Sequence, residues 1–228
     1  MKKRMQYLSV VLCFIFMSGC SGLKIERNVS NNVFYSSANP SVRIKISPEF
    51  RYVGTAEERK HNAYSDGTVG GVTVDCTSYI FVQKDRYNYL KKAISIRFYS
   101  TQGSGYWQSD IFSWLKNMID SGIMNIHGEN YQFSVIADPH PFTITELTTI
   151  NSNGCIVPNC LLAKGFGRRV STDNKTKMII LYAEDAQFKG SNNYGYRQWL
   201  NVEAFTDEQR EFLREFMVRS EGNIKIVD

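Results

Sequence analysis

Cys76, Asp138 and His140 are the residues whose types and spacing come closest to a catalytic site. A thiolate is a strong nucleophile, and Cys76 directly follows the carboxylate of Asp75. Asp138 and His140 stand in Asp-Pro-His-Pro, where they could orient one another as an acid–base pair. We favour structural interpretations, because Cys76 falls on the apolar side of a predicted strand and Asp-Pro-His-Pro is typical of an exposed turn. A small hydrolase using these residues is the alternative function.

Ser113 and Lys116 have the S-x-x-K spacing in which a lysine can activate a serine hydroxyl within one helical turn. The spacing resembles the nucleophile motif of penicillin-binding proteins and β-lactamases. The companion motifs of those enzymes are missing, since Lys175-Thr176-Lys177 lacks the glycine of K-T-G and no S-x-N stands in a suitable place. We therefore predict no catalytic residue in this segment.

The sequence carries no pattern that predicts a metal or a cofactor. The three histidines are far apart, and no second cysteine or histidine pair at zinc-ligand spacing accompanies Cys155 and Cys160. Gly165-Phe166-Gly167 lies in a strand-like run and lacks the full glycine spacing and the following helix of a phosphate-binding loop. We expect no metal and no cofactor.

The segment from Gly190 to Trp199 carries the residue types that dominate binding hot spots. It is rich in Gly, Asn and Ser and contains Tyr194, Tyr196, Arg197 and Trp199. Tyr, Trp and Arg are the types that contribute most to binding energy in protein interfaces. These four residues are our candidates for contact with a protein or glycan partner. The alternative is that the aromatic side chains of this loop fold back into the core.

The N-terminus has the three parts of a secretory signal. Lys2, Lys3 and Arg4 form a positive head, residues 8–17 are apolar apart from Ser9, and small residues follow. A membrane-spanning helix needs about 20 apolar residues, and this segment is about half that length. The segment is therefore predicted to be a signal and not a transmembrane helix.

Met17-Ser18-Gly19-Cys20 resembles the lipobox of bacterial lipoproteins. The resemblance implies that residues 1–19 are cleaved off and that Cys20 carries lipid. Two or more acyl chains anchor a protein stably, whereas one chain binds only marginally. Ser21 resembles the residue at this position in lipoproteins sent to the outer membrane. The resemblance thus implies a bacterial envelope protein anchored in the outer membrane and facing the periplasm.

Without residues 1–19 the chain is almost neutral. The whole chain has 27 basic and 22 acidic residues, and three of the basic ones lie in the signal. The mature chain therefore has 24 basic and 22 acidic residues, a net charge of +2. This balance lacks the concentrated basic face that nucleic-acid binding needs. We expect contact with the membrane through the lipid and no nucleic-acid partner.

Three cysteines besides Cys20 remain in the mature chain, namely Cys76, Cys155 and Cys160. An odd number allows at most one internal disulfide. Cys155 and Cys160 stand at the two ends of a short, turn-rich segment. The compartment outside the inner membrane can oxidise thiols. We take Cys155–Cys160 as the candidate disulfide, with two free thiols as the alternative.

Residues 20–41 are expected to form a tether and residues 42–228 a globular domain. Eight of the fourteen residues from Asn28 to Ser41 are Asn or Ser, a composition typical of flexible linkers. The apolar Val33-Phe34-Tyr35 could instead dock onto the domain.

Period-two alternation predicts β-strands through most of the domain. The alternation is clear at residues 42–46, 72–82, 94–98 and 131–135, and residues 161–170 and 177–183 flank a turn as a predicted hairpin. Residues 178–183 are apolar throughout, which predicts a central strand covered on both faces. Ile224 and Ile226 predict a last short strand.

Helical spacing occurs in three segments. Six apolar residues from Trp107 to Ile119 recur at the helical period, Thr206 begins a capping box, and a weaker helix is expected over residues 143–149. Strands in runs with few helices predict a single α+β domain, a mostly antiparallel sheet packed by two or three helices. The layout is similar to the Mog1/PsbP-like sandwich.

These features together predict a lipid-anchored bacterial cell-envelope protein. We expect its domain to bind an envelope protein, a glycan or another ligand without chemistry of its own. The alternative remains a small envelope hydrolase with a Cys or Asp–His site. The identity of the ligand or partner, the oligomeric state and whether the domain faces the periplasm or the outside are left open by the sequence.

Overall fold

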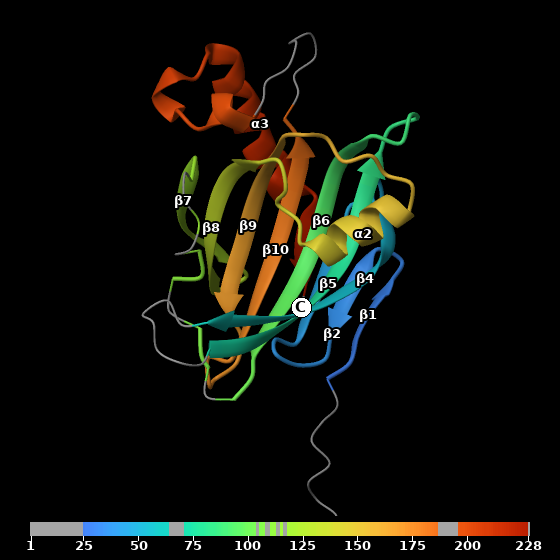
Figure 1. The fold of residues 1–228 in the computed structure, drawn as a ribbon, viewed down its shortest axis with the longest axis vertical. Helices are drawn as coiled ribbons and strands as arrows, with labels where there is room; N and C mark the ends of the chain where they lie inside the picture. Colours follow the sequence, from blue (N-terminus) through green and yellow to red (C-terminus); the bar gives the residue numbers. More distant parts are fainter. Residues whose placement is uncertain are drawn as a thin grey trace, which may run out of the picture.

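Two antiparallel β-sheets form the framework of the protein in the computed structural model, which describes residues 25–63, 71–103, 105–107, 110–112, 115, 118–186 and 196–227 (Figure 1). The larger sheet contains β4 (Arg51–Ala63), β5 (Gly71–Lys84), β6 (Leu90–Thr101), β7 (Asp120–Ile126), β8 (Glu129–Asp138), β9 (Leu161–Arg169) and β10 (Thr176–Asp185). Its strand order is β4-β5-β6-β10-β9-β8-β7. The smaller sheet has the order β1-β2-β3-β11 and contains β1 (Arg27–Ser30), β2 (Val33–Ser36), β3 (Val42–Ile46) and β11 (Ile224–Val227).

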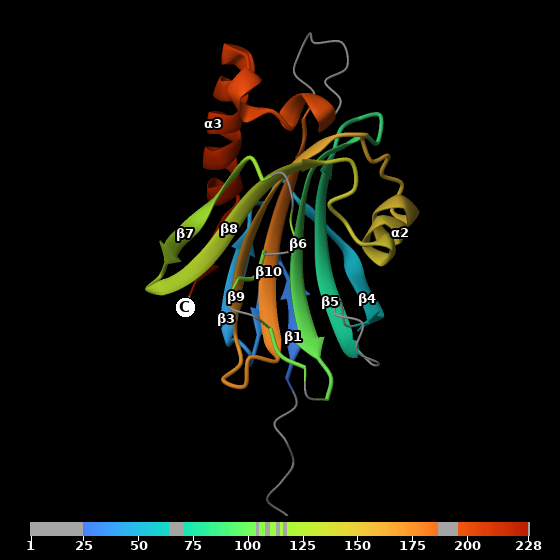
Figure 2. The same ribbon diagram turned by 60° about the vertical axis from the view of Figure 1, so that its left-hand side comes forward.

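The large sheet lies between two layers of different composition (Figure 2). Helix α2 (Ile144–Ser152) covers part of one face, while the small sheet and helix α3 (Asp207–Gly222) lie on the other. Two short 3-10 helices, η1 (Tyr196–Trp199) and η2 (Val202–Ala204), precede α3. The main apolar core fills the space between the sheets and includes Phe34, Ile44, Phe81 and Phe216. A second apolar cluster, with Ile80, Leu181 and Ile150, lies under α2.

Most predicted strands are confirmed, and their burial follows the pattern that predicted them. On β3 the side chains of Val42, Ile44 and Ile46 are buried and those between them are exposed. Strand β10 is buried from Lys177 onward and lies at the centre of the large sheet, as its apolar run predicts. Strands β9 and β10 pair as the predicted hairpin.

The two α-helices in the described residues each begin at a threonine that closes a capping box. The hydroxyl of Thr143 accepts the backbone N–H of Glu146, and that of Thr206 accepts the backbone N–H of Gln209. In each case the side chain three residues on returns a hydrogen bond to the backbone of the threonine. The predicted helices over residues 143–149 and after Thr206 are therefore confirmed.

The predicted helix from Trp107 to Ile119 is wrong. The residues that the structure describes in this segment lie in turns and irregular loop, and Ile111, Phe112 and Leu115 pack as a small apolar cluster with Ile179 of β10. Ile111 and Leu115, two of the six spaced apolar residues, thus pack through tertiary contacts and not on a helical stripe. Gly122, three residues beyond this segment, lies inside β7, an edge strand that the alternation did not predict.

Part of the segment expected as a tether belongs to the folded domain. Residues 27–36 form β1 and β2, and the side chain of Phe34 is completely buried between the two sheets. This is the docking of Val33-Phe34-Tyr35 that the sequence left open. The ordered domain thus begins well before Val42, while residues 20–24 lie outside the described part of the chain.

The protein is thus a single, sheet-dominated domain with mostly antiparallel pairing. Strands account for most of the framework, and the helices are additions to it, so the fold is richer in β-structure than a sheet evenly packed by helices. No helix in the described residues is both long and apolar enough to span a bilayer.

Candidate functional site

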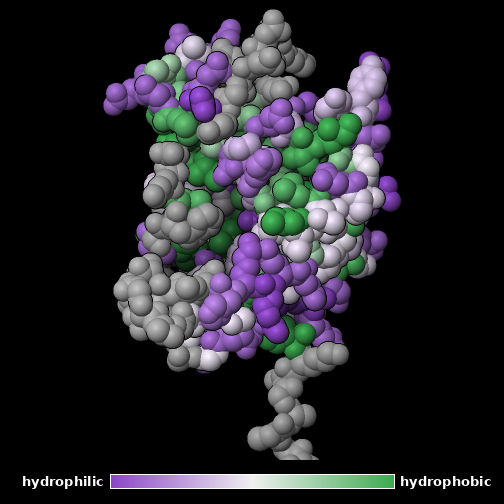
Figure 3. All heavy atoms as spheres, viewed as in Figure 1, coloured by the Kyte–Doolittle hydropathy of each residue, from purple (hydrophilic) through white to green (hydrophobic). Residues whose placement is uncertain are grey.

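A pocket of about 580 Å³ opens on the face of the large sheet that α2 partly covers. Its floor comes from β4, β5, β6, β10, β9 and β8, one wall comes from the segment around Phe112, and the other from Pro141, Phe142 and Thr143 before α2. Figure 3 shows hydrophobic side chains inside a hollow of this face, with hydrophilic residues beside it. Pockets of about 300–1,000 Å³ with apolar walls and a few polar groups are typical of small-molecule sites.

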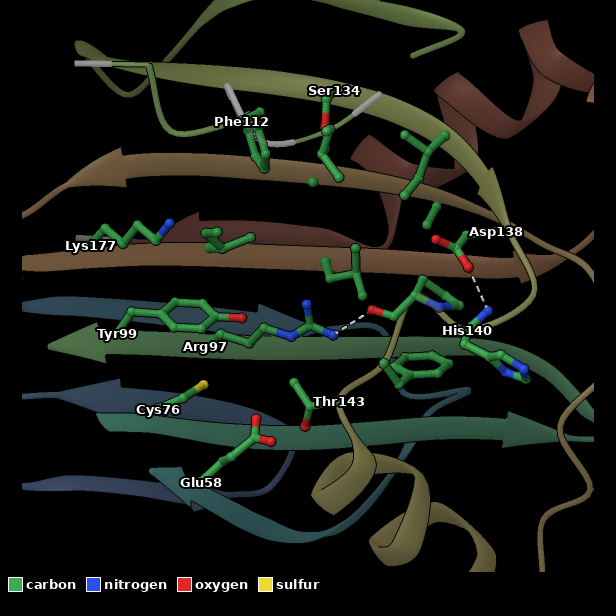
Figure 4. Close-up of a pocket in the computed structure, with 18 of the residues that line it drawn as sticks. Glu58, Cys76, Arg97, Tyr99, Phe112, Ser134, Asp138, His140, Thr143 and Lys177 are labelled. Carbon is green, nitrogen blue, oxygen red and sulfur yellow. Dashed lines mark hydrogen bonds between the residues drawn. The ribbon is translucent and has the colours of Figure 1, made fainter. Parts of the chain in front are cut away.

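A row of polar side chains crosses the floor near one end of the pocket. Glu58 pairs with Cys76, Cys76 with Tyr99, and Tyr99 with Lys177, so the four residues stand side by side on β4, β5, β6 and β10. Directly opposed residues of neighbouring strands point to the same face of a sheet. All four line the pocket, as Figure 4 shows.

Beyond this row the floor is mainly apolar, and some of its residues are small. Ile179 and Leu181 follow Lys177 on β10, and Ala163 and Gly165 lie beside them on β9. Ile136 of β8 continues this surface toward Phe142 at the far end. The pocket therefore has a polar end and an apolar body.

Lys177 is the most unusual residue of the site. Its side chain is 4 % exposed, and its Nζ lies 3.8 Å from the centre of the Trp107 ring and 5.1 Å from that of Tyr99. No carboxylate of the described residues forms an ion pair with it. Burial disfavours the charged form and lowers the pKa of Lys177 to about 8. The aromatic rings stabilise the cation only in part, by cation–π attraction.

Two glycines of β9 allow one wall of the pocket to form. A Cβ at Gly165 would lie 3.0 Å from two ring atoms of Phe112, and a Cβ at Gly167 would lie 2.9 Å from Cγ2 of Ile111. Without side chains at these positions, the segment carrying Ile111 and Phe112 packs directly on the strand. The polar row and the apolar floor are thereby enclosed from this side.

The opposite wall is fixed by a buried ion pair. Arg97 of β6 donates two hydrogen bonds to the carboxylate of Glu146 on α2, at 2.8 and 2.7 Å, and a third to the carbonyl of Pro141 at 2.9 Å. Ser95 and the backbone N–H of Thr143 donate to the same carboxylate. Burial alone would raise the pKa of Glu146, but attraction to Arg97 together with the hydrogen bonds from Arg97, Ser95 and Thr143 lowers the pKa overall. Arg97 is thus neutralised within the protein.

The three catalytic candidates line this one pocket but do not form a catalytic set. The backbone N–H of His140 donates to Asp138 at 2.7 Å, a bond that closes the turn, while the imidazole points away from the carboxylate (Figure 4). Cys76 stands in register with Lys177, and Asp138 with Asp185, eight residues further along β10. Eight residues of strand span about 26 Å, so Cys76 lies far from Asp138 and His140. Burial raises the pKa of the Cys76 thiol, which makes it a poor nucleophile.

The candidate disulfide is absent, because Cys155 and Cys160 are both free and buried. Cys155 belongs to the apolar cluster under α2, whereas Cys160 belongs to the core between the two sheets. The two thiols are therefore held on different sides of the large sheet. Joining them would remove one side chain from its packing.

The candidate binding loop is placed only in part. Tyr194 and the side chain of Tyr196 lie outside the described residues, and Arg197 is exposed. Trp199 is completely buried and packs against Phe205 and Phe212, at ring-centre distances of 5.3 and 6.0 Å. Trp199 is thus a core residue, in line with the alternative that aromatic side chains fold back into the domain.

Cys20, Ser113 and Lys116 also lie outside the described residues. In the part of the chain that is described, no group of three His, Cys, Asp or Glu side chains gathers in a way that could hold a metal ion. No known protein family, no curated protein and no solved structure matches this chain.

The residue that sequence reasoning missed is Lys177. It was assigned only as the start of a hairpin strand, although a lysine opening the apolar run of a central strand is a detectable signal. Burying an amine without a paired charge is costly, so a lysine at such a position is a candidate functional residue.

Proposed function

We propose that the protein is a lipid-anchored component of the bacterial cell envelope whose domain binds a small-molecule ligand in the pocket between Phe112 and Phe142. The pocket itself carries the proposal, since it combines an apolar body with a short row of polar groups. Binding requires no covalent chemistry, and among the described residues that line the pocket no nucleophile and base converge, which supports a binding role over hydrolysis. The layout similar to a Mog1/PsbP-like sandwich stays part of this proposal.

The pocket is a better candidate than the loop of residues 190–199. Of the four residues expected to contact a partner there, Trp199 is occupied by packing against Phe205 and Phe212. A hot spot requires an accessible aromatic side chain that a partner can cover. The pocket, in contrast, offers apolar surface that is still open to a ligand.

The proposed anchor rests on the lipobox-like Met17-Ser18-Gly19-Cys20. Lipid on Cys20 would hold the domain at the outer membrane, facing the periplasm. The described chain enters the domain through β1, on the side of the large sheet opposite to the pocket (Figure 2). An anchor that arrives there leaves the pocket face free for a ligand.

Two experiments test the two parts of the proposal. A Cys20→Ala variant should lose metabolic labelling by fatty acid, and persistent labelling would contradict the anchor. For the pocket, a photo-crosslinking amino acid is placed at Ile136 in the lipidated protein in cells, with the exposed Val218 of α3 as the matched control position. Irradiation should give an adduct of small-molecule mass at position 136 and not at 218. If position 136 gives no such adduct, the pocket is not a ligand site.

A further inference from the structure

Lys177 differs from the other cations that line the pocket in the described groups around it. Arg97 is bound to Glu146, and Lys60 lies 3.0 Å from Glu58. Among the described residues Lys177 has aromatic neighbours but no carboxylate partner. An ammonium group has three N–H donors, and ring stacking leaves donors free for a hydrogen-bond acceptor. An anion is the ligand group that completes this environment.

The charges of the pocket give such a ligand one orientation. Lys177 lies in the polar row at one end, whereas Asp138 lies at the other end, eight residues of strand away. An anionic group is attracted to the first end and repelled from the second. A ligand with one anionic end would therefore place it at Lys177 and its neutral end toward Asp138.

The surface between these ends is suited to a hydrocarbon chain. It presents Ile179, Leu181, Ala163 and Ile136 in succession, and Phe142 closes it. Each methylene buried on such a surface contributes to binding. The distance along the floor is long for a compact molecule, while a volume of about 580 Å³ accommodates one chain and not the two chains of a phospholipid.

We propose that the pocket binds a single-chain anionic amphiphile, with its head group at Lys177 and its chain along Ile179, Leu181 and Ile136 toward Phe142. The inference rests on the proposed ligand-binding function and names its ligand class. A carboxylate and a phosphate monoester share the required head-group chemistry, so a fatty acid and a lysophospholipid are the two sources to compare.

Photo-labelling of the lipidated protein in isolated membranes tests the inference. The probe is hexadecanoic acid with a diazirine at the end of the chain, and hexadecanol with the same diazirine is the uncharged control. The acid should label the peptides containing Ile136 and Phe142 roughly tenfold more strongly than the alcohol, because a charged hydrogen bond to Lys177 is lost in the alcohol. Lys177→Met should reduce labelling by the acid to the level of the alcohol.

The control variant is Lys45→Met, which removes the same charge from an exposed position on β3. It should label as the unaltered protein does. Equal labelling of the pocket by acid and alcohol, unchanged in Lys177→Met, would overturn the anionic class while leaving a ligand-binding pocket in place. Labelling that maps outside the pocket would also overturn the inference. The proposed function would then be decided separately, by the experiment with the photo-crosslinking amino acid at position 136.

Two further probes distinguish the sources. A diazirine-labelled lysophosphatidic acid that competes with the acid probe and depends on Lys177 would assign a phosphate head group, and failure to compete would assign the carboxylate. A two-chain phosphatidic acid should label the pocket at least tenfold less than either. Labelling at equal strength would overturn the single-chain assignment.

Discussion

Arg97 on β6 and Glu146 on α2 form a buried ion pair with two direct hydrogen bonds, and their side chains are 8 % and 0 % exposed. The same carboxylate closes the capping box of α2 through the backbone N–H of Thr143. One side chain thus starts the helix, neutralises a charge on the sheet and fixes the wall of the pocket at Pro141. This pair is the main polar link between α2 and the large sheet.

Removing the charge of Glu146 should destabilise the protein strongly. Glu146→Gln keeps a side chain that can close the capping box but leaves the guanidinium of Arg97 buried without a counter-charge, which costs about 3–5 kcal/mol. The free energy of unfolding from urea denaturation measures the effect. The double variant Arg97→Met with Glu146→Gln has no buried charge and should recover most of the loss. A change below about 1 kcal/mol for Glu146→Gln alone would show that the pair is not the link described.

Lys177 should make stability depend on pH in the alkaline range. Its pKa is about 8 in the folded protein and 10.5 in the unfolded chain, so between these values the unfolded state holds a proton that the folded state has lost. Stability therefore rises with pH in this window, by about 1.4 kcal/mol per pH unit relative to a variant without the amine. Below pH 8 both states are protonated and the full cost of the buried charge is present.

The comparison is between the unaltered protein and Lys177→Met, by urea denaturation from pH 7 to pH 11. At pH 7 the variant should be the more stable of the two by roughly 3 kcal/mol, and the difference should vanish above pH 10.5. The other titrating groups are common to both proteins and cancel. Parallel curves would mean that Lys177 keeps an ordinary pKa.

The packing of Phe112 on Gly165 predicts a coupled pair of substitutions. Gly165→Ala places a Cβ at 3.0 Å from the ring, so the ring and its segment must move, at a cost of about 1–3 kcal/mol. In a Phe112→Ala background the same substitution meets no ring and should be close to neutral. Unfolding free energies of the four proteins in this double-mutant cycle give the coupling. If Gly165→Ala costs the same in both backgrounds, Phe112 does not pack against this position.

The three cysteines of the domain should be free and unreactive in the folded protein. Burial raises the pKa of Cys76, of Cys155, and of Cys160 to about 12, so none carries appreciable thiolate at neutral pH. Iodoacetamide should leave the native protein unmodified and add three groups in urea without any reductant, as counted by mass spectrometry. A mature protein that accepts only one group in urea would contain the Cys155–Cys160 disulfide after all.

Much of the sheet could be predicted because its strands alternate, and the errors have specific physical causes. The alternation of Val42, Ile44 and Ile46 with polar residues predicts a strand that is buried on one side, because every second residue of a pleated strand faces the core. Composition misled at β1 and β2, where Asn31 and Asn32 form the turn between the strands while Phe34 and Ser36 are both fully buried. β1 pairs with β2 and β2 with β3, but the packing of Phe34 against Tyr79 and Phe98 of the large sheet is a long-range property that a local window does not contain.

The pocket could be predicted only in part, because it also depends on contacts between residues far apart along the chain. Cys76, Asp138 and His140 were recognised by residue type, but their separation on the sheet depends on strand register. The apolar residues from Trp107 to Ile119 were assigned to a helix because their spacing fits one. Ile111 and Phe112 of this segment pack on Gly167 and Gly165, some fifty residues away along the chain, and no helical signal distinguishes the two outcomes.

Trp199 and Arg197 lie in the same short helix, η1, but alanine substitutions at the two positions should affect stability very differently. Trp199→Ala removes a completely buried ring from its contacts with Phe205 and Phe212 and should cost about 3–5 kcal/mol of unfolding free energy. Arg197 is exposed, so Arg197→Ala should change stability by less than about 0.5 kcal/mol. Urea denaturation of both variants at neutral pH makes the comparison. If Trp199→Ala proves as mild as Arg197→Ala, the ring is not part of the core, and Trp199 becomes available to a partner as the sequence first indicated.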